Sequence, residues 1–181
     1  MLGYWHGDED TALAIDQDAW LHTGDRAEIV DGRIYLMGRT KDTLVLSTGE
    51  KVAPGELELR ITQDPLVEQA MVVGQGMPYV GALLVLNRGS WSELARTLTL
   101  DPHDPGSLVA EKVRDMMIET VQRLLQDLPS YAQVRRVCLS LEPWTTDGGL
   151  LTPTMKLKRR VIEQRFEAEI RGLYEGHDVD F

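Results

Sequence analysis

The alternation of apolar and polar positions along the chain predicts a mixture of strands and helices. Apolar, β-branched runs are typical of buried strands, and three such runs occur at residues 67–74, 82–86 and 134–141. Apolar residues at helical spacing predict four helices, at 54–62, 90–98, 107–128 and 158–173. The expected fold class is therefore α+β, with a small three-stranded sheet packed with helices.

Individual residues refine these expected helices. Pro54 suits a first helical turn, and Ser90 is the expected N-cap of the second helix. The longest helix is expected to end before Pro129. Its expected apolar face consists of Val109, Val113, Met116, Val121, Leu124 and Leu128.

Two hairpins are expected in the first third of the chain. Asp31-Gly32 separates two extended runs, and residues 47–50 separate two more. Asp-Gly is a strong hairpin signal because glycine accepts positive φ. A lone hairpin is marginally stable and needs a surface on which to pack. Either the later residues supply that surface to residues 1–40, or a partner does.

Composition and charge narrow the function classes. The 181 residues are 43% hydrophobic and 27% charged, which is globular composition. Lys and Arg total 19 against 29 Asp and Glu, a net charge of −10. No nucleic-acid partner is expected, because phosphate binding needs a basic surface. No apolar run approaches the ~20 residues of a membrane span, and the acidic residues 1–10 do not form a targeting signal.

The common catalytic and metal-binding signatures are absent. There is no phosphate loop, no dinucleotide fingerprint and no short-spaced histidine pair, so no metal site is expected. The single cysteine, Cys138, excludes an intrachain disulfide and suits a reducing cytosol. Because it lies in an apolar run, we expect a buried, inert thiol.

Three segments are candidates for chemistry. Asp25 follows Thr-Gly and could accept two hydrogen bonds from a ribose diol, although spacing alone favours a plain turn. Arg39 could donate to phosphate or sugar oxygens beside a hinge, although a solvated linker is the simpler interpretation. Lys156 follows Thr-Pro-Thr-Met and could stabilise developing negative charge, the alternative being a solvated helix start.

Together and in this order, these segments resemble the C-terminal part of adenylate-forming enzymes. That superfamily includes acyl-CoA synthetases, firefly luciferases and the adenylation domains of peptide synthetases. Residues 20–25 resemble its Thr-Gly-Asp motif, 32–39 the strand leading to its ribose-contacting arginine, and 47–58 the hairpin and helix that follow. Residues 151–159 resemble its final lysine motif. Most branches have Gly-Lys there, and Met155-Lys156 fits the long-chain fatty acyl branch.

The resemblance implies a division of the chain and of its roles. Residues 1–40 would be the tail end of a large, missing N-terminal domain, and 41–181 the mobile C-terminal domain. The implied reaction converts ATP, a fatty acid and CoA into acyl-CoA, AMP and pyrophosphate, and the chain alone would be inactive. The implied site residues are Lys156 (catalytic), Asp25 and Arg39 (nucleotide-binding), Lys41 and Asp42 (hinge) and Gly49 (CoA path).

The resemblance also implies partners. The missing adenylation domain would hold ATP or AMP and Mg²⁺, with a fatty acid and CoA as substrates, and none of these is expected on this chain alone. The expected location is cytoplasmic, with peripheral membrane association of the parent left open. In the first forty positions, five apolar side chains are expected either to be exposed or to be buried by self-association between chains: Trp5, Trp20, Ile29, Ile34 and Leu36. The alternatives are a ligase for another acyl or aryl acid, and a free-standing, non-catalytic module that binds a partner or a nucleotide.

Overall fold

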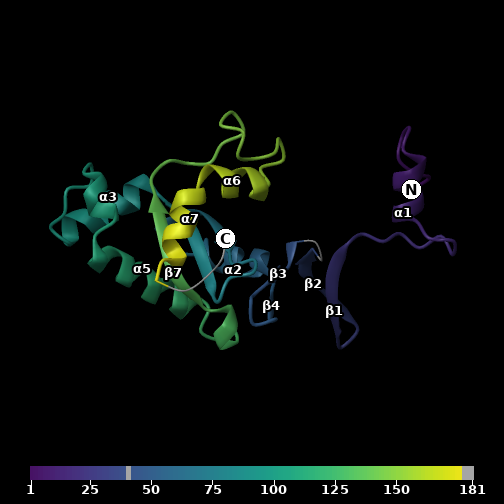
Figure 1. Cartoon of the computed structure of the whole chain (residues 1–181), viewed down its shortest axis with the longest axis horizontal. Helices are drawn as coiled ribbons and strands as arrows, with labels where there is room; N and C mark the ends of the chain where they lie inside the picture. Colours follow the sequence, from purple (N-terminus) through teal and green to yellow (C-terminus); the bar gives the residue numbers. More distant parts are fainter. Residues whose placement is uncertain (40–41, 177–181) are drawn as a thin grey trace. The chain divides into compact units, whose positions relative to one another are not determined.

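A computed structural model describes residues 1–39 and 42–176. The chain forms two compact units, Met1–Thr43 and Leu44–Phe181 (Figure 1).

The first unit contains a short helix and a hairpin. Helix α1 (Asp8–Ala14) was not expected, and strands β1 (Asp25–Val30) and β2 (Arg33–Arg39) pair antiparallel. Asp31 and Gly32 have φ values of 50° and 74°, the geometry of a two-residue hairpin turn, so the first expected hairpin is confirmed.

Large apolar side chains of the first unit lie in solvent. Trp5 is 91% exposed and Trp20 is 73% exposed, and Ile29 and Ile34 are similarly open, as expected. The side chain of Leu36 lies outside the described residues. Among the described residues of this unit, the exposed side chains of the hairpin therefore have no packing surface.

The second unit is built on a three-stranded sheet. Its strands are β5 (Val67–Val73), β6 (Val80–Leu86) and β7 (Val134–Ser140), in the order β5-β6-β7. The β5–β6 pair is antiparallel and the β6–β7 pair is parallel. Every residue of the central strand β6 is buried, which explains its continuous apolar sequence. The expected fold class is confirmed.

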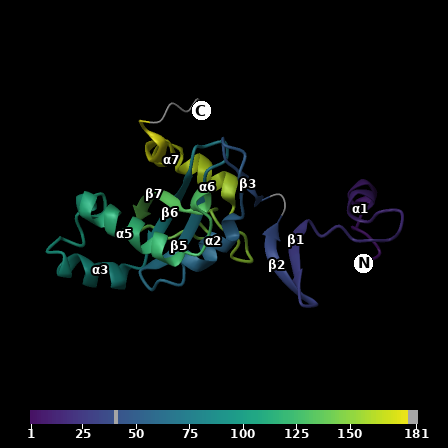
Figure 2. The same ribbon diagram turned by 90° about the horizontal axis from the view of Figure 1, so that it is seen from below.

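Helices cover both faces of this sheet (Figure 2). Helices α2 (Pro54–Ile61), α3 (Arg88–Thr97) and α5 (Glu111–Leu124) bury one face. Helices α6 (Arg159–Arg165) and α7 (Glu167–Tyr174) bury the other, together with the segment containing Trp144 and Leu150. Smaller elements are the second hairpin, β3 (Leu44–Val45) and β4 (Lys51–Val52), helix α4 (Pro105–Leu108) and a 3₁₀ turn (Ser130–Ala132).

Two expected helices are interrupted. The helix expected over 107–128 is two helices, α4 and α5, and the one expected over 158–173 breaks at Phe166 into α6 and α7. The break before α5 changes which side chains face the core. The fully buried positions are Val113, Met117, Val121 and Leu125, whereas Val109 is 62% exposed. The expected apolar face was therefore wrong at Val109, whereas Met116 is half-buried and packs against the core.

The expected N-cap of α3 was also wrong. The side chain of Asn87 accepts hydrogen bonds from the backbone amides of Gly89 and Ser90, at 3.0 and 3.1 Å. The Ser90 hydroxyl instead donates to the carbonyl of Pro65. Asn87 directly follows β6, so the chain turns into the helix earlier than the apolar pattern indicates.

Candidate functional site

The segment that carries Lys156 is a short closed hairpin, called here the lysine loop (residues 151–157). Leu151 and Leu157 form a β-bridge at its base. The amide of Met155 donates to the carbonyl of Thr152, and the amide of Thr152 donates to the carbonyl of Lys156, both at 2.8 Å. The Thr152 hydroxyl accepts from the Lys156 amide at 3.0 Å. The backbone of Lys156 is therefore fixed by hydrogen bonds on both of its polar groups.

Met155 occupies an unusual backbone conformation in this loop. Its φ is +61°, in the left-handed region, and its side chain is 67% exposed. A turn followed by one left-handed residue is a common three-residue hairpin connection, in which glycine is favoured at the left-handed position. The backbone therefore favours glycine at this position and places strain on methionine here.

The side chain of Lys156 is exposed. Its ammonium group makes no hydrogen bond or ion pair with any residue in the described part of the chain. A fixed backbone with an unpaired, solvent-facing cation is suited to contact an anion supplied by another body.

The entrance to the lysine loop is anchored to β5. The side-chain amide of Gln69 donates to the carbonyl of Trp144 at 3.0 Å, and its oxygen accepts from the Trp144 amide at 2.7 Å. Leu150 and Leu151, between Trp144 and the loop, are buried in the core. These hydrogen bonds and the two buried leucines therefore fix the position at which the lysine loop leaves the core.

The exit from the loop is anchored to α2. Both terminal guanidinium nitrogens of Arg159 contact the carboxylate of Glu58, at 2.8 and 2.6 Å. The same carboxylate accepts from the Val72 amide on β5, at 2.7 Å. Both residues lie within segments that resemble the family's motifs, and neither was expected to have a role of its own. No local feature of the sequence indicated that they would meet.

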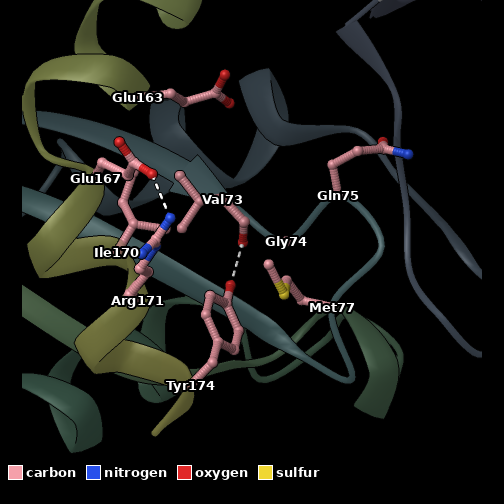
Figure 3. Close-up of a pocket in the computed structure, with 9 residues that line it drawn as sticks. All are labelled: Val73, Gly74, Gln75, Met77, Glu163, Glu167, Ile170, Arg171 and Tyr174. Atoms are coloured by element: carbon pink, nitrogen blue, oxygen red, sulfur yellow. Dashed lines mark hydrogen bonds and ion pairs between the residues drawn. The ribbon is translucent and has the colours of Figure 1, made fainter. Parts of the chain in front are cut away.

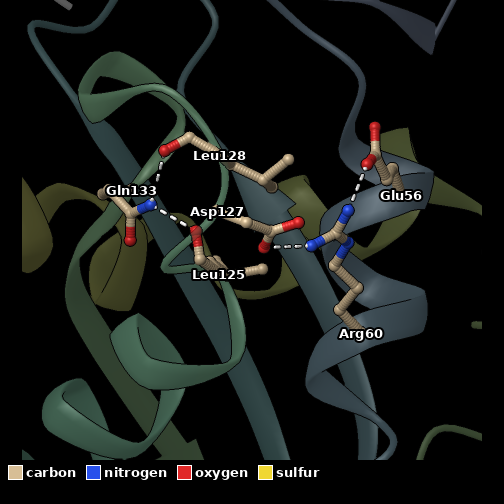
Figure 4. Close-up of polar contacts among 6 residues, drawn as sticks. All are labelled: Glu56, Arg60, Leu125, Asp127, Leu128 and Gln133. Atoms are coloured by element: carbon tan, nitrogen blue, oxygen red, sulfur yellow. Dashed lines mark hydrogen bonds and ion pairs between the residues drawn. The ribbon is translucent and has the colours of Figure 1, made fainter.

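Helix α2 is fixed at its far end by a second arginine (Figure 4). Arg60 pairs with Glu56 one turn earlier and with Asp127 beyond α5. The Asp127 carboxylate raises the pKa of Arg60, and the guanidinium in turn lowers the pKa of Asp127. In the same region, the side-chain amide of Gln133 donates to the carbonyls of Leu125 and Leu128.

The first unit brings two expected site residues together. In the β1–β2 register Asp25 is the cross-strand partner of Arg39. Asp25 is exposed, and its amide donates to the Thr23 hydroxyl at 3.2 Å. Of the two expected hinge residues, Asp42 is exposed, whereas Lys41 lies outside the described residues.

Gly49 lies at the turn of the second hairpin. Its φ is +92°, and no heavy atom of the described residues, its two chain neighbours aside, lies within 4 Å of the position that a Cβ would take. The backbone turn alone therefore favours glycine here, and neighbouring atoms of this chain leave room for a side chain. Its expected place on a CoA path stays a prediction.

Cys138 is half-buried on β7 rather than fully buried. Burial raises the pKa of its thiol, and the negative charge of Glu169 adds to that effect. A raised pKa disfavours the thiolate, as expected for an inert cysteine.

An apolar cavity of about 350 Å³ lies between α6, α7 and the end of β5 (Figure 3). Ile170, Tyr174 and Met77 form part of its wall, and the buried Tyr174 hydroxyl donates to the carbonyl of Val73 at 3.2 Å. An ion pair between Glu167 and Arg171 lies at its side. None of the expected site residues lines this cavity.

The described residues contain neither a candidate metal cluster nor a candidate membrane-spanning helix. No group of three or more His, Cys, Asp and Glu side chains in 1–39 and 42–176 could hold a metal ion. No helix in the described part of the chain has the length and apolar character needed to cross a membrane.

Comparisons with known proteins place these features in a family. Residues 41–178 match the model of the AMP-binding enzyme C-terminal domain. The chain is 35% identical to "Probable acyl-activating enzyme 16, chloroplastic" of Arabidopsis thaliana, over 96% of this chain and 26% of that protein. It is 32% identical to a long-chain-fatty-acid–CoA ligase of Mycobacterium tuberculosis, over 95% of this chain and 29% of that protein. It therefore spans about a quarter of the length of the curated relatives it matches.

A solved structure supports the same assignment. The adenylation domain of the carboxylic acid reductase from Segniliparus rugosus, in complex with AMP and a carboxylic acid, superposes with a TM-score of 0.78 and 27% sequence identity. The match covers 95% of this chain and 26% of that structure. With the family model matching most of the sequence, the chain belongs to the family of AMP-binding enzyme C-terminal domains.

Proposed function

We propose that this chain is the C-terminal part of a long-chain fatty acid–CoA ligase. The observation that carries the proposal is the fixed lysine loop with its unpaired, exposed Lys156. Membership of the AMP-binding family supports an adenylating enzyme. The Thr-Pro-Thr-Met-Lys sequence at 152–156 and the similarity to a long-chain-fatty-acid–CoA ligase support a long-chain acid.

In this proposal the reaction has two steps at one site. A fatty acid carboxylate oxygen attacks the α-phosphorus of ATP, and the bond to the bridging oxygen breaks to release pyrophosphate. The thiol of CoA, losing its proton, then attacks the acyl carbonyl and displaces AMP. Lys156 stabilises the negative charge that develops around the phosphate in the first step. Asp25 accepts hydrogen bonds from the ribose hydroxyls of AMP, and Arg39 assists it.

The division of the chain follows from the same proposal. Residues 1–40 end a large adenylation domain, and residues 41–181 form the domain that moves over it, with Lys41 and Asp42 at the hinge. In the second pose Gly49 lines the path of CoA. Mg²⁺ would bind together with ATP in the adenylation domain. A single, half-buried cysteine suits a reducing compartment, and we place the ligase in the cytoplasm.

The test separates the two steps in an enzyme that joins this chain to its adenylation domain. Lys156→Ala should reduce acyl-AMP formation by on the order of 100-fold or more. It should largely preserve thioester formation from supplied acyl-AMP, because that step does not use the lysine. Lys158→Ala, a nearby exposed lysine, is the matched control and should leave both steps near normal. Equal loss of both steps in Lys156→Ala would refute the proposed role.

A second candidate shares the first step. The resemblance to the adenylation domain of a carboxylic acid reductase is compatible with another acid or another acyl acceptor. Product analysis with long-chain, short-chain and aryl acids in the presence of CoA distinguishes the candidates. If acyl-AMP forms only from aryl acids, an aryl acid ligase replaces the long-chain proposal. If no acid gives acyl-AMP but the protein still binds a nucleotide or a partner, the chain is a non-catalytic module.

A further inference from the structure

We infer that Glu58 and Arg159 act as a positioning pair that holds Lys156 in place for the adenylation step. The inference rests on the proposed function, because it gives the pair a purpose only if Lys156 acts on the reacting phosphate. Arg159 lies three residues after Lys156 and begins helix α6. Its partner is 101 residues away in sequence, on α2.

The geometry of the pair restricts orientation as well as distance. Two guanidinium nitrogens meet two carboxylate oxygens, at 2.8 and 2.6 Å. The side chains of Arg159 and Glu58 are only 24% and 12% exposed, so water competes weakly for either partner. A two-point contact of this kind prevents rotation about a single hydrogen bond. The start of α6, and with it the exit of the lysine loop, is therefore held at one angle.

Glu58 is itself held from two sides. Its carboxylate accepts from the Val72 amide at 2.7 Å, which connects it to the edge strand β5. Its helix is connected to the region beyond α5 through Arg60 and Asp127 (Figure 4). The anchor for Arg159 is therefore a rigid platform and not a flexible surface carboxylate.

Both ends of the lysine loop are therefore connected to the same strand, β5. Gln69 of β5 binds the backbone of Trp144 at the entrance, and Val72 of β5 binds Glu58 at the exit. Between these anchors the loop is closed by its own hydrogen bonds. A small displacement of Arg159 would therefore be transmitted to the backbone of Lys156.

The same pair connects the elements used in the two proposed steps. Helix α2 starts two residues after β4, the second strand of the hairpin that carries Gly49. Glu58 on this helix therefore joins the hairpin and the lysine loop into one body. That arrangement suits a domain that must present one element and withdraw the other in a single rotation.

The main test uses Glu58→Gln in the full enzyme. Glutamine keeps the size of the side chain and an oxygen for the Val72 amide, but it loses the charge that holds Arg159. We expect acyl-AMP formation to fall by about tenfold or more, mainly in kcat, because small misplacements of a catalytic group are costly. Thioester formation from supplied acyl-AMP should change by less than about twofold. Arg159→Lys, which keeps charge without the two-point contact, should lie between wild type and Arg159→Ala.

A matched control and a structural readout separate positioning from folding. Glu56→Gln, on the same helix, breaks an ion pair that does not touch the lysine loop, and it should leave acyl-AMP formation near normal. Amide hydrogen exchange of the 181-residue chain should quicken across residues 151–157 in Glu58→Gln, with the β6 core unchanged. The exchange measurement reads the loop directly and does not depend on activity.

The outcomes are distinct. Normal acyl-AMP formation in Glu58→Gln, equal loss of both steps, or unaltered exchange in the lysine loop would each overturn the positioning role. If Lys156→Ala is selective for the first step and Glu58→Gln is not, only the positioning role fails. If Lys156→Ala itself spares acyl-AMP formation, the proposed function fails, whatever Glu58→Gln does.

Discussion

Asp25 and Arg39 are direct cross-strand partners in the first hairpin. The two residues belong to separate motifs, fourteen positions apart. The Asp31-Gly32 turn sets the register from Val30–Arg33 to Ala27–Leu36, and an irregularity between Arg26 and Ala27 then shifts it by one residue. Without that shift Asp25 would lie opposite Gly38 instead of Arg39. The hairpin therefore presents an acceptor and a donor at adjacent backbone positions.

This register predicts that the two residues act as a unit on the nucleotide. In the full enzyme, Asp25→Asn and Arg39→Ala should each weaken AMP binding by about tenfold, the loss expected for a charge-assisted hydrogen bond. The loss of AMP affinity in the double variant should be smaller than the product of the two single losses, because neighbouring groups couple. Calorimetric titration with AMP measures the cycle. Strict additivity would indicate that the residues bind separately.

The left-handed conformation of Met155 predicts a stabilising substitution. Met155→Gly should raise the free energy of unfolding of the chain by about 1 kcal/mol, since glycine adopts positive φ without the Cβ penalty. Met155→Ala removes the same exposed side chain but keeps the Cβ, and should give no such gain. Urea unfolding of both variants measures the difference. An equal gain in unfolding free energy in Met155→Ala would mean that removal of the side chain, and not relief of the positive φ, is the cause.

The burial of Glu58 predicts a large cost when its partner is removed. Arg159→Ala should destabilise the chain by about 3 kcal/mol, because it leaves a carboxylate in a poorly hydrated place without its cation. Adding Glu58→Gln to Arg159→Ala should recover part of the loss, since the orphaned charge is gone. The measurement is urea denaturation at neutral pH. A double variant that is less stable than Arg159→Ala would contradict this explanation.

The burial of the Tyr174 hydroxyl predicts that the folded chain loses stability in alkaline solution. Burial raises the pKa of its hydroxyl above the usual 10.0, so folding favours the neutral form. The stability that the neutral Tyr174 hydroxyl contributes is fully present below about pH 10. It is lost as the pH rises towards the folded-state pKa, because Tyr174 ionises first in the unfolded chain. Tyr174→Phe should cost about 1 kcal/mol at pH 7, where the Val73 carbonyl loses its donor.

The variant also supplies the pH test. The difference in unfolding free energy between wild type and Tyr174→Phe should shrink between pH 9 and pH 12, as measured by urea denaturation. Tyr131→Phe, at an exposed position, is the control and should show no such change. A difference that stays constant across this range would show that the hydroxyl does not titrate as the burial implies.

Local chemistry was enough to anticipate much of this fold. The Asp-Gly turn, the unbroken apolar run of β6 and the Pro54 helix start act between neighbours in the chain, and all three appear where the pattern places them. The position of Lys156 after Thr-Pro-Thr-Met likewise indicated an exposed lysine. These features depend on dihedral preference and on apolar periodicity, which a short segment carries by itself.

Other features exist only because distant segments pack together. The full burial of Met117 and the half-burial of Met116 depend on how α5 lies against the sheet, and the break at Phe166 accompanies packing of that side chain against the core. The Glu58–Arg159 contact joins residues 101 positions apart, and neither residue carries a local signal of the other. Such contacts depend on the sheet, because strand β5 holds α2 and the lysine loop within reach of each other.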